Sequence, residues 1–234
     1  MSVILVFMAA LAAIIIWWMA KQRLLSKPWL EVGTAADTSF ANRSPAPTAK
    51  IGLGVFLAVV GALFSLFISA YFMRMQGSDW WSLPMPRLLW VNTGVLAASS
   101  AALHWASVDA KRGRDDLMRI SLLAAFTLGI VFLVGQILAW RQLVSEGYVL
   151  ADNPANSFFY LITGMHGLHI LGGLFALGRT IRRSIGGTSA AKTHLGVELC
   201  AIYWHFMLLV WLVLFAFFGG WANNLIDICR QLLT

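Results

Sequence analysis

Two histidines lie three residues apart in a segment of the chain that is otherwise apolar. The segment FFYLITGMHGLHILGG, residues 158–173, contains His166 and His169, and Thr163 precedes His166 by three residues. On a helix this spacing places the three side chains on one face. Imidazole can bind a metal, carry a proton or form hydrogen bonds. Because polar groups are costly in hydrocarbon, we expect this face to point toward protein rather than lipid.

A second polar stripe lies in the last apolar segment, where Glu198 and His205 are seven residues apart. The two stripes have two interpretations: their side chains form a metal site between two helices, or they form a buried network of hydrogen bonds. We favour the network, because carboxylates are scarce and the segments contain no Glu-x-x-His pair. The prediction is a structural polar network of Thr163, His166, His169, Glu198 and His205, without a metal ligand or a catalytic residue.

The composition is that of a membrane protein. Of the 234 residues, 59% are hydrophobic and 12% are charged, whereas soluble domains have about a quarter of their residues charged. The net charge of +7 comes from basic residues in short connections between apolar segments. This pattern indicates membrane topology and excludes nucleic acid as a partner. The two cysteines form neither a disulfide framework nor a metal-binding pattern.

Six segments are long and apolar enough to cross a bilayer, each about 20 residues at a rise of about 1.5 Å per residue. They cover residues 2–20, 51–73, 88–107, 120–140, 158–178 and 195–218. We therefore expect an all-α integral membrane protein, a bundle of six transmembrane helices. Its parts are an extra N-terminal helix at 1–20, a cytoplasmic linker at 21–50 and a five-helix domain at 51–234.

Basic residues concentrate in alternate connections between these segments. Residues 21–50, 108–119 and 179–194 contain most of the Lys and Arg of the chain, and the remaining connections contain few. Connections rich in Lys and Arg stay on the inner side of the membrane. The alternation therefore predicts that the N-terminus and the C-terminus both lie outside.

Two longer stretches of sequence carry a resemblance to a known family. SFFYLITGMHGLHILGG at 157–173 contains a TG-x-HG-x-H element, and ELCAIYWHFMLLVWLVLF at 198–215 contains an E-x5-W-H-F element with a Trp six residues after the His. In this order and separation they resemble subunit III of the haem–copper respiratory oxidases, the cytochrome c oxidase type. Weaker resemblance runs from residue 51 to the C-terminus.

The resemblance implies an accessory, non-redox subunit of a haem–copper terminal oxidase in aerobic respiration. Such a subunit packs on catalytic subunit I, with subunit II in the same complex, and has no cofactor of its own. Haem and copper are then expected in the catalytic partner. The family holds phospholipid in a cleft between helices and supports proton uptake and stability during turnover. A multi-pass location in the bacterial plasma membrane follows.

The resemblance also implies where lipid headgroups bind. At some positions this sequence differs from the family pattern. Lys192 and His194 match basic positions that lie near a headgroup on the inner side, and the neighbouring Arg182 and Arg183 can attract anionic lipid. A buried Glu of the family is replaced here by Val60. An Asp three residues after the last His is replaced by Leu208. Family members have two helices or none before the common five, whereas this chain has one.

Two alternative functions remain open. One is the related accessory protein of nitric oxide reductases, which shares the fold. The other is a small proton-coupled transporter that uses Glu198 and the histidines as a proton relay. No internal repeat and no pair of broken helices supports the transporter. The electron donor of an oxidase complex, cytochrome c or quinol, is left open as well.

Overall fold

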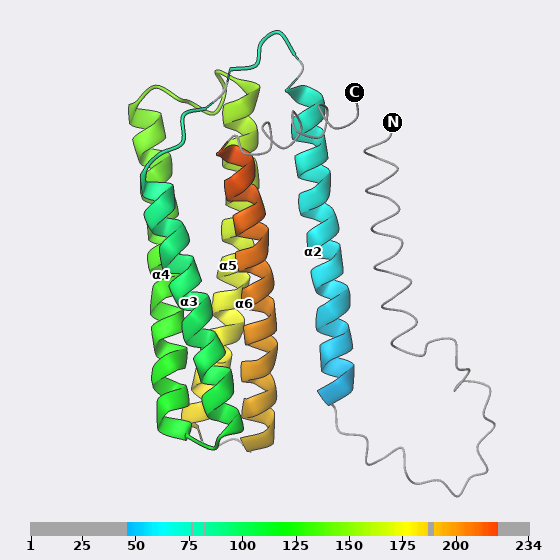
Figure 1. Ribbon diagram of the computed structural model, residues 1–234, viewed down its shortest axis with the longest axis vertical. Helices are drawn as coiled ribbons and strands as arrows, with labels where there is room; N and C mark the ends of the chain where they lie inside the picture. The colour runs from blue at the N-terminus through cyan, green and yellow to red at the C-terminus, as the bar shows by residue number, and fades with distance from the viewer. Residues whose placement is uncertain (1–45, 76, 82, 187–189, 220–234) are drawn as a thin grey trace, which may run out of the picture. The chain divides into compact units, whose positions relative to one another are not determined.

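The computed structural model describes residues 46–75, 77–81, 83–186 and 190–219. These residues form five α-helices and no strand (Figure 1). The helices are α2 (Ala46–Arg74), α3 (Leu88–Lys111), α4 (Asp115–Ser145), α5 (Pro154–Ile185) and α6 (Ala190–Phe218). The all-α membrane class is thereby confirmed. The predicted span at 2–20, the linker up to residue 45 and the tail after residue 219 lie outside the described residues.

Four of the five helices, α2, α4, α5 and α6, are long and apolar enough to cross a membrane. Helix α3 has 24 residues but is not one of the four, because it carries several polar side chains that point into the bundle. Asn92, Ser99 and Ser100 are all buried, and the Ser99 hydroxyl donates to the carbonyl oxygen of Ala125 on α4 at 2.8 Å. The six-span count and the positions of the termini therefore remain predictions.

The helices extend beyond the apolar segments from which they were predicted. Helix α5 starts at Pro154, where Asn153 caps it by accepting a hydrogen bond from the Ala155 N–H at 3.0 Å. Helix α4 starts with Asp115 and Asp116, whose charges suit the positive end of the helix dipole. Hydropathy marks the part of a helix that lies in hydrocarbon, whereas caps and dipoles decide where the helix ends.

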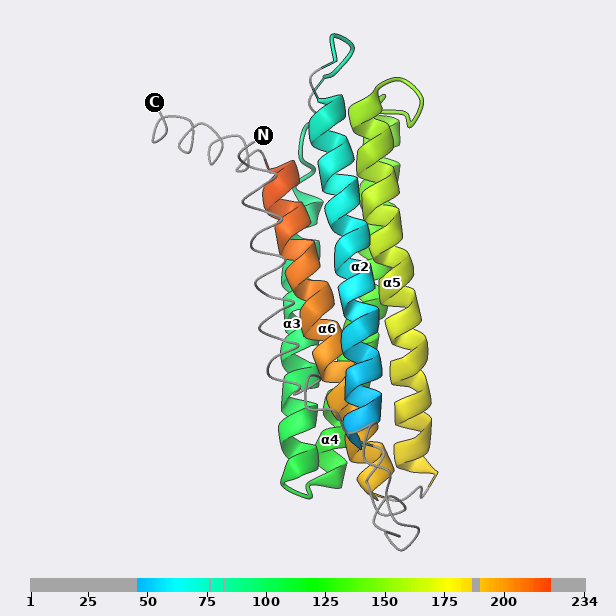
Figure 2. The same ribbon diagram turned by 90° about the vertical axis from the view of Figure 1, so that its right-hand side faces the viewer.

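Helix α3 packs most extensively on α4, while α6 contacts α3 and α5, and α2 contacts α5 and α6. Figures 1 and 2 show the start of α2, the end of α5 and the start of α6 at one end of this bundle. The connection between α3 and α4 lies at the same end. Two of the connections rich in Lys and Arg, α3–α4 and α5–α6, thus lie at the same end as Lys50 near the start of α2, as the predicted orientation requires.

Candidate functional site

His166 lies fully buried on α5 and forms a hydrogen bond with α6. Its Nε2 atom is 3.1 Å from the carbonyl oxygen of Met207, and because a carbonyl oxygen can only accept, Nε2 carries the proton and donates. The ring packs against Phe132 and Trp211, with centroid separations of 5.6 and 4.9 Å. The arrangement holds α5 and α6 together inside the bundle.

Thr163 forms a hydrogen bond with α4. Its hydroxyl accepts a hydrogen bond from the indole N–H of Trp140 at 3.1 Å and donates to the carbonyl oxygen of Phe159 at 2.6 Å. The same device joins α6 to α3, because the indole N–H of Trp211 donates to the Thr93 hydroxyl at 2.9 Å. The predicted network left out Trp140 and Trp211. A Trp and a Thr at similar depth in two apolar segments is the sequence signal that points to such pairs.

His169 lies one helical turn after His166 and is half-buried. Its Nδ1 atom donates to the carbonyl oxygen of Met165 in its own helix at 2.7 Å. The main-chain carbonyl oxygen of His169 accepts a hydrogen bond from the Tyr203 hydroxyl of α6, also at 2.7 Å. His169 therefore takes part in the contact between α5 and α6 through its backbone.

Glu198 and His205 lie on a different face of α6 from the residues that meet His166. The Glu198 carboxylate forms an ion pair with Lys50 of α2 at 2.8 Å. His205 is exposed, and its ring lies beside that of His104 on α3. Among the hydrogen bonds of the described residues, none joins either side chain to Thr163, His166 or His169. The structure thus distributes the five predicted residues over three places.

Among the described residues, no group of three or more His, Cys, Asp or Glu is arranged to hold a metal ion. At Val60 and Leu208, where the resemblance implies an acid in the family, this chain makes apolar contacts. Val60 is buried in the core, and Leu208 packs against that core.

An apolar groove of about 370 Å³ lies between α2, α5 and α6. It is lined by Leu53 and Phe56 of α2, Leu168, Gly172 and Ala176 of α5, and Leu199 and Tyr203 of α6, among others. Helix α5 contributes small residues to the wall, and a Cβ atom at Gly172 would meet no atom within 4 Å. A wall of this kind accommodates an extended apolar chain.

Toward the end of the bundle where α2 and α6 begin, charged residues follow the groove-lining residues along their helices, and Lys50 there is paired with Glu198. Lys50 lies one turn before Leu53 and Arg179 one turn after Ala176, by sequence spacing on their helices. The predicted headgroup residues lie further out at this end. Arg182 and Arg183 occupy the last turn of α5, Lys192 is exposed near the start of α6, and His194 is half-buried. An apolar groove with a basic end matches the two parts of a phospholipid.

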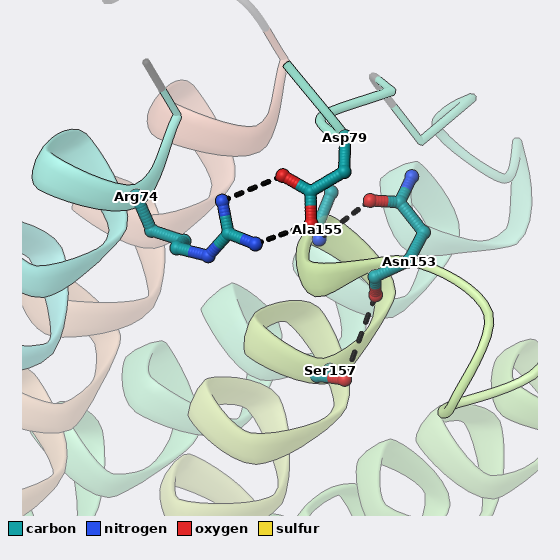
Figure 3. A network of polar contacts seen from close by, with 5 residues as sticks. All are labelled: Arg74, Asp79, Asn153, Ala155 and Ser157. Carbon is teal, nitrogen blue, oxygen red and sulfur yellow. Dashed lines mark hydrogen bonds and ion pairs between the residues drawn. The ribbon is translucent and has the colours of Figure 1, made fainter. Parts of the chain in front are cut away.

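A polar network at the opposite end fixes the connection between α2 and α3 (Figure 3). The Arg74 guanidinium donates to the Asp79 carboxylate at 2.8 Å. Asn153, the cap of α5, donates from Nδ2 to the carbonyl oxygen of Trp81 at 2.7 Å. The hydrogen bond from Arg74 holds the pKa of Asp79 below its usual range, because it stabilises the ionised carboxylate. The connection is therefore tied to α2 and to the start of α5.

Comparison with known proteins shows that the sequence is similar to one protein family. The sequence model of the family described as cytochrome c oxidase subunit III matches residues 48–223. The chain is 33% identical over 191 residues to cytochrome c oxidase subunit 3 of Thermostichus vulcanus, an alignment that covers 78% of this chain and 92% of the relative.

It is 30% identical over 192 residues to the probable cytochrome c oxidase subunit 3 of Mycobacterium tuberculosis, covering 78% of this chain and 93% of that protein. With cytochrome c oxidase subunit 3 of Mus musculus the identity is 32% over 133 residues, which covers 57% of this chain and 50% of the mouse protein. The similarity thus spans nearly all of the first two relatives and half of the third.

Proposed function

The chain belongs to the cytochrome c oxidase subunit III family, and on this premise we propose that it is an accessory, non-redox subunit of a haem–copper terminal oxidase. It packs on catalytic subunit I, in a complex that includes subunit II, and binds phospholipid in the groove between α2, α5 and α6. Haem and copper belong to the catalytic partner. The chain supports proton uptake and stability during turnover, in the plasma membrane of a bacterium.

The apolar groove with its basic end is the observation that carries the lipid part of this proposal. An acyl chain lies against Leu53, Phe56 and the bare backbone of Gly172, because these surfaces lose nothing by contact with hydrocarbon. The phosphate then meets the basic side chains of Arg182, Arg183, Lys192 and His194. Each cation near an anionic membrane surface is worth about 1 kcal/mol, so several together select an anionic headgroup.

The hydrogen bonds of the interior histidines support a structural role for this chain. His166 Nε2 and His169 Nδ1 both donate to carbonyl oxygens, which fixes each ring against main chain, and among the described residues no group of three or more His, Cys, Asp or Glu is arranged around them to hold a metal ion. His205 lies on another face of α6, beside α3. The imidazoles therefore act in helix packing, while redox chemistry is assigned to the partner subunit.

Purification of the tagged chain from a mildly solubilised membrane tests the assignment to an oxidase. We expect larger chains to co-purify and to contribute a haem absorption spectrum, while the chain freed from them has no haem or copper. Stoichiometric metal in the isolated chain would contradict the proposal. So would proton-coupled flux by the isolated chain in liposomes, which is the behaviour of a transporter.

A tryptophan placed in the groove tests lipid binding separately. Gly172→Trp introduces a large ring at a residue that lines the groove, and a Cβ atom at Gly172 has no neighbour within 4 Å. Gly54→Trp is the matched control, since Gly54 of α2 is equally unobstructed but does not line the groove. Native mass spectrometry of the complex should show fewer bound phospholipids with Gly172→Trp and an unchanged number with Gly54→Trp. Equal lipid retention in both variants would contradict a site in this groove.

A further inference from the structure

Two imidazoles meet on an exposed face of the bundle, where α3 lies beside α6. The rings of His104 and His205 are 5.7 Å apart between centroids and inclined at 65°, and both residues are exposed. His205 Nδ1 donates to the carbonyl oxygen of Ala201 at 2.5 Å, so in the neutral ring Nε2 is an acceptor. No hydrogen bond between the described residues reaches this acceptor or joins the two rings.

This pair lies at a depth where water is scarce. His205 follows Glu198 by seven residues on α6, which is about 10 Å further into the membrane at 1.5 Å per residue. Polar side chains in the hydrocarbon region face protein or water, because contact with lipid leaves their hydrogen bonds unmade. An exposed imidazole pair at this depth therefore indicates a protein surface that the described residues, 46–219 with short gaps, leave uncovered.

The neighbouring surface of α3 is shaped for close contact with another helix. Between Trp90 and Trp105 its exposed residues include Gly94, Ala98 and Ala101, and a Cβ atom at Gly94 would meet no atom within 4 Å. Small residues three or four apart let the backbones of two transmembrane helices approach, and interhelical hydrogen bonds then add to the contact. His104 follows Ala101 by three residues on α3, so the imidazole pair borders these small residues.

We propose that this surface, the α3–α6 face around His104 and His205, binds a transmembrane helix of another oxidase subunit. A hydroxyl or amide on that helix donates to His205 Nε2 and bridges the two rings. The inference rests on the proposed function and specifies where the partner attaches. Lipid tails offer no donor at this depth. The apolar segment at 2–20 has its only hydroxyl, Ser2, at its start and its indole N–H groups near its end. It therefore has no hydrogen-bond donor in its middle for the imidazole pair, and we favour a partner helix.

A photo-crosslinking amino acid at Ala101 tests the location in the intact complex. Ala124 of α4 is the matched control, because it is also exposed and lies at a similar distance along its helix from the basic end. We expect Ala101 to give an adduct with another oxidase subunit and Ala124 to give none. Adducts from Ala101 to lipid alone, or to residues 2–20 of the same chain, would overturn the proposal.

Variants of the pair test the hydrogen bond. His205→Leu should raise the rate of loss of the chain from the haem-bearing complex by about 3- to 15-fold, the effect of one interhelical hydrogen bond in a membrane. His205→Gln keeps an acceptor and should restore most of the retention. Both side chains are exposed, so unchanged circular dichroism is expected to show that the bundle is intact.

The outcomes separate the two proposals. If the unaltered chain retains a haem-bearing partner and His205→Leu is retained equally well, the assignment of the face is wrong while the proposed function stands. If the unaltered chain retains no haem-bearing partner at all, the proposed function itself is wrong.

Discussion

Replacing Gly173 by alanine is expected to weaken the packing of α5 on α6. A Cβ atom at Gly173 would lie 2.6 Å from Cε1 of Tyr203 and 2.9 Å from Cζ3 of Trp204. Neither ring moves easily, because Trp204 is fully buried and the Tyr203 hydroxyl is held by the carbonyl oxygen of His169 at 2.7 Å. The adjacent Gly172 faces the groove, and a Cβ atom there has no neighbour within 4 Å.

Comparing alanine substitutions at Gly172 and Gly173 isolates the steric cost of a Cβ atom at Gly173. Forcing an extra carbon into a packed interior costs about 1–3 kcal/mol. Alanine also favours a helix over glycine by about 1 kcal/mol, but this gain is common to both positions and cancels in the comparison. Gly173→Ala should therefore be less stable than Gly172→Ala by about 1–3 kcal/mol, which is a factor of about 5 to 150 in the folding equilibrium constant.

Unfolding of each purified variant by titration with SDS, followed by tryptophan fluorescence, measures this difference. A Tyr203→Ala background provides a further check, because removing the nearest ring should relieve part of the penalty of Gly173→Ala. The reasoning is refuted if Gly172→Ala and Gly173→Ala unfold at the same SDS fraction, or if the Tyr203→Ala background leaves the penalty of Gly173→Ala undiminished.

Three other substitutions have defined outcomes. His166→Ala removes a buried ring and its bond to α6, so the SDS titration should show a loss of about 3–5 kcal/mol; a stoichiometric metal that disappears with this substitution would contradict the structural role. The hydrogen bond from Arg74 lowers the pKa of Asp79. The stabilisation from this bond is therefore complete at a pH above the usual aspartate pKa, and it is lost as the pH falls through the lowered pKa. Asp79→Asn should abolish this acid transition in the fluorescence of the interfacial tryptophans, and an unchanged transition argues against it. Thr93→Val leaves the Trp211 N–H without its acceptor and should cost about 1–3 kcal/mol in the same SDS titration; no loss would mean that this bond is not formed.

The sequence was sufficient for the class of the protein and for its family. Long apolar segments predict helices in a bilayer, because a helix satisfies the hydrogen bonds of its own backbone in hydrocarbon, and five of these segments coincide with α2 to α6. The TG-x-HG-x-H and E-x5-W-H-F elements indicated the subunit III family, and the comparisons confirm it. The ends of the helices were harder to predict from the sequence, because Asn153 and Asp115 start α5 and α4 outside the apolar segments.

The partners of the polar side chains were decided by the tertiary structure. Helical periodicity predicts which residues share a face, and on this basis Glu198 was grouped with His205. It does not state which neighbouring helix that face meets. Packing places Glu198 beside Lys50 of α2, His205 beside His104 of α3, and His166 against Met207 on the opposite face of α6. The spacing of two histidines thus determined a polar stripe, while the rotation of each helix about its axis, set by how the side chains interdigitate, decided what that stripe contacts.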